Sequence, residues 1–81
     1  MRFLESHRFR RQYEQAPQLR QRQFQKQLGF LLQDLQHPSL HTKIYNKKKR
    51  IWQARVDGGW RFYFHIRGNT IYLLTIRPHP K

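Results

Sequence analysis

The chain has 81 residues, and its 17 Lys and Arg residues outnumber its 4 Asp and Glu residues, which gives a net charge of +13. This length supports one small domain, here residues 1–81, and excludes the two-domain architectures of larger enzymes. So few carboxylates exclude glycosidase-like carboxylate pairs and two-metal sites, and the absence of Cys excludes disulfides and thiolate metal sites. A compact cation of this strength attracts polyanions, so nucleic acid is the first partner that the composition predicts.

The N-terminal segment MRFLESHRFRR contains no apolar stretch of the length that a signal peptide or a membrane span requires. The chain is therefore expected to have neither a secretory signal nor a membrane partner. A sequence without Cys also fits the reducing cytoplasm. We predict a cytoplasmic protein that binds no metal and needs no cofactor.

The first half of the chain has helical character, although residues 2–5 form too short a segment to assign. Ser6 is a suitable N-cap for a helix that ends near Ala16, and Pro17 suits the first turn of a second helix that continues to Gln36. In the second helix the large apolar residues recur at helical spacing. They predict one buried stripe, made of Phe24, Leu28, Leu31, Leu32 and Leu35.

The second half has the composition and alternation of β-strands. Residues 37–50 are expected to form a loop or a poor strand, and strands are predicted over 51–56, 60–66 and 70–76. In the middle strand, alternation places Phe62 and Phe64 toward a core and Arg61 and Tyr63 on the opposite face. The sequence thus predicts an α+β fold in which two N-terminal helices pack on one face of a twisted antiparallel sheet of three to four strands. The other face, basic and aromatic, stays open.

The remaining chemical groups, mainly Arg, Lys, His and Tyr, suit cleavage of RNA without a metal. The 2′-hydroxyl of the RNA supplies the nucleophile. The protein must then orient this hydroxyl, remove its proton, stabilise the charge on phosphorus and protonate the leaving 5′-oxygen. Arg and Lys can stabilise the charge and His can move the protons, whereas DNA lacks the nucleophile and would not be cut.

The order of motifs from residue 28 to residue 81 supports the same chemistry. A leucine-patterned helix ends before HPSL, and a Lys-containing segment, IWQARV, a short turn, WRFYFHI, a Gly turn and a last strand closing in IRPHPK follow. This arrangement resembles the RelE/ParE superfamily of bacterial toxins, the small basic partners of type II toxin–antitoxin systems. The resemblance implies a RelE-like fold and a ribosome-dependent endoribonuclease that cuts messenger RNA and so inhibits translation.

The same resemblance implies roles for individual residues. Arg61 matches the family's phosphate-stabilising Arg, and Arg55 matches a basic position on the neighbouring strand. His79 stands where relatives of the YoeB type carry a His, and Lys43 lies in the segment where relatives place a Lys or Glu that acts as base. The chain departs from the pattern at Pro80, where some relatives have a catalytic Tyr, and it lacks a Glu in the loop, so the identity of the general base stays open.

Further side chains are predicted to contact the nucleic acid or to serve the fold. The basic and aromatic residues assigned to nucleic-acid binding are Lys47, Lys48, Lys49, Arg50, Tyr63, His65, Arg77 and Lys81. By contrast, Trp52 and Trp60 are expected in the core, and His37 and His41 are expected to be structural loop residues.

The resemblance also implies two partners: a cognate acidic antitoxin, and messenger RNA on the ribosome with contacts to 16S rRNA. Two alternatives remain open. Charge and aromatic content alone would also fit a non-catalytic nucleic-acid-binding module. A ParE-like inhibitor of DNA gyrase would share the fold without the ribonuclease residues.

Overall fold

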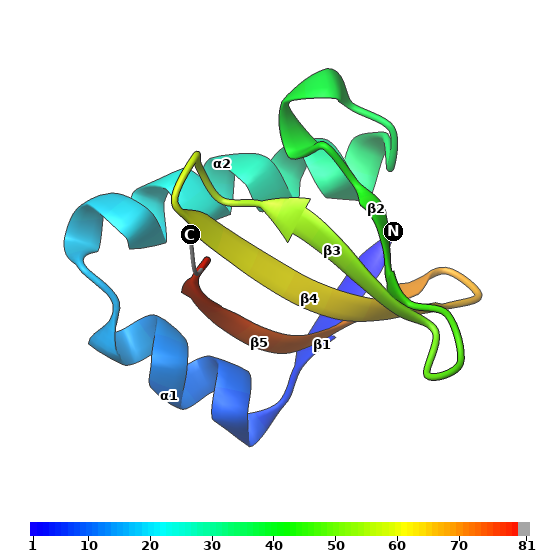
Figure 1. The fold of residues 1–81 in the computed structure, drawn as a ribbon, viewed down its shortest axis with the longest axis horizontal. Helices are drawn as coiled ribbons and strands as arrows, with labels where there is room; N and C mark the ends of the chain where they lie inside the picture. Colours follow the sequence, from blue (N-terminus) through cyan, green and yellow to red (C-terminus); the bar gives the residue numbers. More distant parts are fainter. Residues whose placement is uncertain (80–81) are drawn as a thin grey trace.

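The computed structural model describes residues 1–79, and it contains two α-helices, a short 3-10 helix and five strands (Figure 1). The elements follow in the order β1 (Arg2–Glu5), α1 (His7–Gln15), α2 (Gln18–Gln33), η1 (Pro38–Leu40), β2 (Lys43–Asn46), β3 (Ile51–Arg55), β4 (Trp60–Arg67) and β5 (Thr70–Pro78). The α+β architecture predicted from the sequence is therefore confirmed.

The five strands form one mixed sheet in the order β1-β5-β4-β3-β2. Strands β2 to β5 pair antiparallel, as expected, but β1 pairs parallel with β5. The expectation of three to four antiparallel strands was wrong in count and, at one edge, in direction. All four residues of β1 are exposed, so no burial pattern marks the strand, and its identity comes from pairing with a segment about 70 residues away.

Local signals account for the helix boundaries. The Ser6 hydroxyl accepts a hydrogen bond from the Phe9 N–H at 3.0 Å and caps α1, which confirms the predicted start. Helix α2 ends at Gln33 instead of Gln36, because Asp34 leaves helical geometry and its side chain accepts a hydrogen bond from the Gln36 N–H at 2.9 Å. Within residues 1–79, neither helix has the length and apolar character needed to cross a bilayer.

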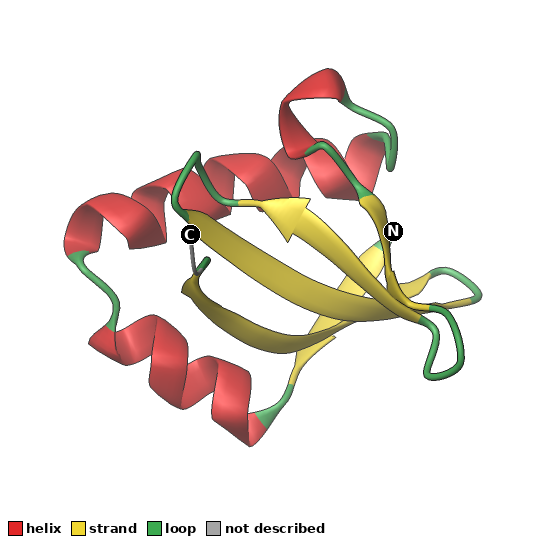
Figure 2. Ribbon diagram, in the orientation of Figure 1, coloured by secondary structure: helices red, strands yellow, loops and turns green. Residues whose placement is uncertain are grey.

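The two helices take different positions on the sheet (Figure 2). Helix α2 lies across one face of the sheet, whereas α1 lies beside β5. The side chain of Gln12 in α1 accepts hydrogen bonds from the Thr75 hydroxyl at 2.7 Å and the Ile76 N–H at 3.0 Å. The opposite face of the sheet carries the polar residues of the central strands. It is less open than expected, because Gln53, Arg61 and Tyr63 on this face are buried.

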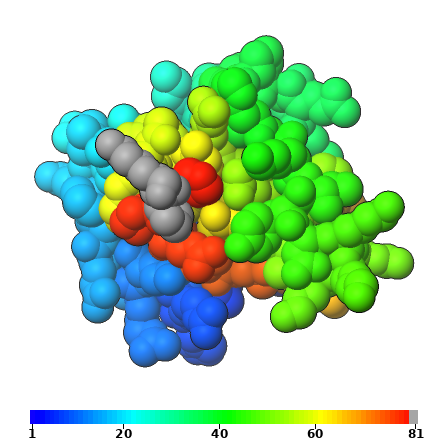
Figure 3. Space-filling view, in the orientation of Figure 1, coloured from blue at the N-terminus to red at the C-terminus, as the bar shows by residue number. Residues whose placement is uncertain are grey.

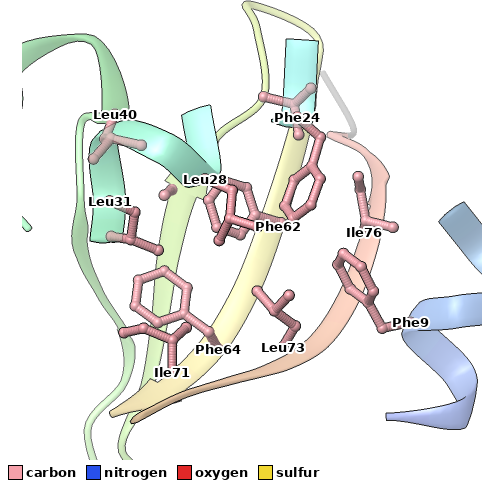
Figure 4. Close-up of a cluster of buried hydrophobic side chains, with 12 residues drawn as sticks. Phe9, Phe24, Leu28, Leu31, Leu40, Phe62, Phe64, Ile71, Leu73 and Ile76 are labelled. Carbon is pink, nitrogen blue, oxygen red and sulfur yellow. The ribbon is translucent and has the colours of Figure 1, made fainter. Parts of the chain in front are cut away.

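The hydrophobic core lies between α2 and the sheet and includes Phe9 from α1 (Figure 4). Rings of Phe24 and Phe62 meet edge to face with centroids 5.0 Å apart, an arrangement favoured by aromatic quadrupoles. Of the predicted helical stripe, Phe24, Leu28 and Leu31 are buried, and Leu32 and Leu35 pack partly buried against the same cluster. Trp52 and Trp60 also pack against it, in agreement with their expected role.

The core predicts a contrast between two leucines of α2. Leu31 is fully buried and Leu19 is 54% exposed. Leu31→Ala should therefore lower the free energy of unfolding by about 2–5 kcal/mol, whereas Leu19→Ala should change it by less than about 0.5 kcal/mol. Urea denaturation followed by circular dichroism measures both, and equal effects would contradict the described packing of α2.

Candidate active site

Three arginines lie side by side on the open face of the sheet. The strand register pairs Arg55 of β3 with Arg61 of β4, and Arg61 with Arg77 of β5. Like charges directly opposite one another destabilise a sheet, so stability alone does not account for this row. The arrangement concentrates positive charge where a phosphate could sit.

A pocket of about 340 Å³ opens beside this row, and we call it the arginine pocket. It is lined by His41, Thr42, Lys43, Gln53, Arg55, Arg61 and His79. All four residues predicted to be catalytic, Lys43, Arg55, Arg61 and His79, therefore meet in one place, and no carboxylate from residues 1–79 lines it. In Figure 3, the end of β5 in red and the segment around β2 in green border the surface of β4 in yellow.

The turn between β3 and β4 positions two of these residues. The guanidinium Nη1 of Arg61 donates to the backbone carbonyls of Asp57, Gly58 and Trp60 at 2.7, 3.2 and 3.0 Å. The backbone N–H of His79 donates to the carbonyl of Gly59 at 2.7 Å. The turn between β3 and β4 thus fixes both the Arg61 side chain and the backbone of His79 at the end of β5.

The carboxylate of Asp57 organises this turn. It accepts hydrogen bonds from the N–H groups of Gly59 at 2.8 Å and Trp60 at 2.9 Å, and it forms an ion pair with Arg20 of α2. A simple structural interpretation of Arg61 pairs it with the Asp57 carboxylate, but that carboxylate is bound to Arg20. Arg61, only 7% exposed, consequently keeps its positive charge at the pocket without a carboxylate partner among the described residues.

Gln27 connects the opposite wall of the pocket to α2. Its side-chain amide donates to the carbonyls of Arg55 at 2.9 Å and Ser39 at 3.0 Å, and its oxygen accepts from the Ser39 hydroxyl at 3.0 Å. Gln27 is itself only 6% exposed. A buried glutamine therefore fixes the end of β3, which bears Arg55, relative to η1, which leads into His41 and Lys43.

His41 is the residue that the sequence interpretation missed. It follows η1 with a left-handed backbone (φ 47°), which turns the chain into β2, and its exposed side chain lines the arginine pocket. His37, the other loop histidine, has the expected structural role: its ring stacks on Phe30 with centroids 3.9 Å apart. The sequence offered one indication of a role for His41, which is that it lies two residues before the predicted catalytic residue Lys43.

The predicted nucleic-acid-binding residues divide into separate groups. Tyr63 and Arg77 lie on the open face next to the arginine pocket, with the Arg77 guanidinium 4.8 Å from the centre of the Tyr63 ring. The turn at 47–50 lies at the other end of the β2–β3 hairpin from Arg55, and Lys47 and Arg50 line a different hollow. His65 contacts the Arg50 carbonyl at 2.9 Å and does not reach the arginine pocket. Lys81, like Pro80, lies outside the described residues.

Among residues 1–79, no three His, Cys, Asp or Glu side chains gather in a way that could hold a metal ion. The chemistry that the pocket can perform with its own side chains is charge stabilisation by Arg and Lys and proton transfer by His.

Comparison with solved structures identifies the fold. A YoeB/ParE toxin from Agrobacterium tumefaciens matches with a TM-score of 0.80 at 14% identity, over 99% of this chain and 100% of that one. YafQ from E. coli strain BL21(DE3) matches with a TM-score of 0.78 at 15% identity, over 98% and 94% of the two chains. The archaeal RelE–RelB complex from Pyrococcus horikoshii OT3 contains a chain that matches with a TM-score of 0.78 at 15% identity, over 95% and 92%.

No protein-family model matches the sequence, and no curated protein sequence matches it. The likeness is therefore one of fold, and it extends over nearly the whole chain. The protein has the RelE/ParE toxin fold that the ordered motifs predicted.

The buried amide of Gln27 yields a stability prediction. Gln27→Leu would leave the carbonyls of Arg55 and Ser39 buried without this donor, so the free energy of unfolding should fall by about 1–3 kcal/mol. Gln25→Leu, at an exposed position of the same helix, should change it by less than about 0.5 kcal/mol. Urea denaturation of both variants measures the difference, and a neutral Gln27→Leu would show that these hydrogen bonds do not hold the pocket wall.

Proposed function

We propose that the protein is the toxin of a type II toxin–antitoxin system and cleaves messenger RNA on the ribosome. The observation that carries this proposal is the arginine pocket, where two His residues lie among Lys43, Arg55 and Arg61, and where none of the described residues contributes a carboxylate. Support also comes from the matching solved structures, which include a YoeB/ParE toxin and a RelE–RelB antitoxin–toxin complex from Methanococcus jannaschii.

The proposed reaction is attack of the RNA 2′-oxygen on the adjacent phosphorus. A bond forms between this oxygen and phosphorus, and the bond from phosphorus to the 5′-oxygen breaks. A general base takes the proton of the 2′-hydroxyl, and a general acid gives a proton to the leaving 5′-oxygen. The products are a 2′,3′-cyclic phosphate and a 5′-hydroxyl, and no water is consumed in this step.

The pocket offers a side chain for each task. Arg55 and Arg61, in register on neighbouring strands, stabilise the negative charge that develops on the phosphate oxygens. Lys43 adds a positive charge from the β2 wall. Arg61 is held by three carbonyls, so the charge is oriented before the substrate arrives and need not reorganise during the reaction.

Proton transfer is assigned to His41 and His79. They come from different walls, His41 from the segment between η1 and β2 and His79 from the end of β5. In-line displacement places the attacking and leaving oxygens on opposite sides of phosphorus, so an acid and a base on different walls suit it. This assignment supplies the second proton-transfer group that the sequence interpretation left open.

The proposed protein partner is an acidic antitoxin. A net charge of +13 on 81 residues favours a polyanionic partner, and two of the matching structures contain a toxin with its antitoxin. Co-expression of the antitoxin is expected to restore growth of cells that produce this chain.

The proposed activity is tested by expressing the chain in bacteria and mapping new 5′ ends of messenger RNA. Cuts should fall in register with codons, and His79→Ala should reduce them by about a hundredfold or more, because general acid–base catalysis contributes about 10²–10⁴. His7→Ala changes an exposed histidine of α1 and should leave cleavage unchanged. A chain that slows growth without codon-linked cuts would instead support a non-catalytic nucleic-acid binder or a gyrase inhibitor.

The role of His41 is tested on purified ribosomes programmed with messenger RNA. His41→Ala should lower the single-turnover cleavage rate by about a hundredfold and leave the free energy of unfolding almost unchanged, because the side chain is exposed. A message with a 2′-deoxy nucleotide at the cut position should resist the wild-type protein. If His41→Ala cleaves at the wild-type rate, Lys43 is the better assignment for the second proton-transfer group.

A further inference from the structure

A second hollow, of about 410 Å³, lies on the same open face, and we call it the tyrosine groove. It is lined by Ser6, Arg8, Tyr45, Ile51, Tyr63, Leu74, Thr75 and Arg77. Its described lining contains no carboxylate, and its side chains combine aromatic and aliphatic surface with two arginines. A planar aromatic ligand attached to a negative charge would complement both properties.

The two tyrosines have different roles in this groove. Tyr63 is only 3% exposed, and it lies against the Arg77 guanidinium, so it forms a fixed part of the lining. Tyr45 is 53% exposed, and its ring meets that of Tyr63 at 66° with centroids 4.8 Å apart. An exposed large aromatic ring, oriented by a buried one, presents a surface on which a flat ring can stack.

The groove also adjoins the arginine pocket. Arg77 lines the groove and is the cross-strand neighbour of Arg61, which lines the pocket. Tyr63 follows Arg61 by two residues on the same face of β4, a spacing of about 7 Å along a strand. A phosphate in the arginine pocket would therefore bring the base of an adjoining nucleotide to the groove.

Two hydroxyl groups of the groove are already engaged within the protein. Ser6 donates its hydroxyl hydrogen to the Leu74 carbonyl at 2.8 Å, and Thr75 donates to the Gln12 side chain at 2.7 Å. Neither of these two hydroxyls can donate to the edge of a base without giving up an internal hydrogen bond. Stacking on the exposed ring of Tyr45, which every base permits, needs no such loss.

We propose that the tyrosine groove binds, by stacking on Tyr45, the base of a nucleotide adjoining the phosphate in the arginine pocket. This proposal rests on the proposed function, because it takes RNA to be the ligand of the arginine pocket.

The test measures binding of a 2′-O-methyl tetranucleotide, which cannot be cleaved by 2′-hydroxyl attack, at one fixed salt concentration. Tyr45→Ala should weaken binding by about five- to a hundredfold, the usual range for loss of one base-stacking contact. Tyr45→Phe keeps the ring and should bind like the wild type. Ile44→Ala is the matched control, since Ile44 precedes Tyr45 in β2 and is 52% exposed.

Removing bases from the ligand completes the test. Tetranucleotides that lack the base at one position in turn are bound to the wild type and to Tyr45→Ala. At one position, loss of the base should weaken wild-type binding and abolish the difference between the two proteins, because the stacking contact is already gone.

The outcomes separate this proposal from the proposed function. If Tyr45→Ala binds like the wild type, or weakens binding equally whichever base is missing, the groove is not a base site, even when the protein cleaves messenger RNA. If the base-dependent effect of Tyr45 is found and no cleavage occurs on ribosomes, the groove binds a base and the proposed ribonuclease activity is wrong.

Discussion

Three arginine side chains lie next to one another on three neighbouring strands, and no carboxylate of the described part of the chain pairs with them. The rest of the structure depends on holding this row in place. Arg55, Arg61 and Arg77 occupy one row of the open face, and the carboxylate nearest in sequence, Asp57, is bound to Arg20. Such a row repels itself. The fold must hold the arginine row in place through contacts on the other side of the sheet. This arrangement leaves the positive charge of the row available for an anion.

Helix α2 holds the arginine row in place through two different kinds of contact. Its apolar side, which includes Phe24, Leu28 and Leu31, is buried against the sheet and contributes the larger part of its stabilisation. Two polar residues of the same helix then bind segments that carry pocket residues: Arg20 binds Asp57 in the turn that holds Arg61, and Gln27 binds the end of β3 that bears Arg55. The same element therefore stabilises the core and positions the charged row.

The open face has two adjoining regions with different chemistry. The arginine pocket collects charge and proton-transfer groups, whereas the tyrosine groove collects aromatic and aliphatic surface. Arg77 lines the groove and connects the two regions, since it neighbours Arg61 across the strands and lies against the ring of Tyr63. A chain that carries a phosphate and a planar base in alternation matches this division.

Alternation and helical spacing were enough to predict the core strands, both helices and the basic face of the sheet, because these features depend on neighbours a few residues away. The candidates Lys43, Arg55, Arg61 and His79 came instead from the resemblance of the ordered motifs to the RelE/ParE superfamily. The sequence did not show which segments distant along the chain pair with one another. Strand β1 is defined by its pairing with β5, and the Arg20–Asp57 ion pair joins α2 to the turn between β3 and β4. His41 lines the arginine pocket because η1 and the left-handed backbone at His41 direct the chain toward it. The sequence by itself determined which strand residues face the hydrophobic core and which face the other side of the sheet. Only the tertiary structure decided which of the polar residues meet and that Arg61 and Tyr63 are buried among them, because this depends on strand register and on hydrogen bonds between segments that are distant along the chain.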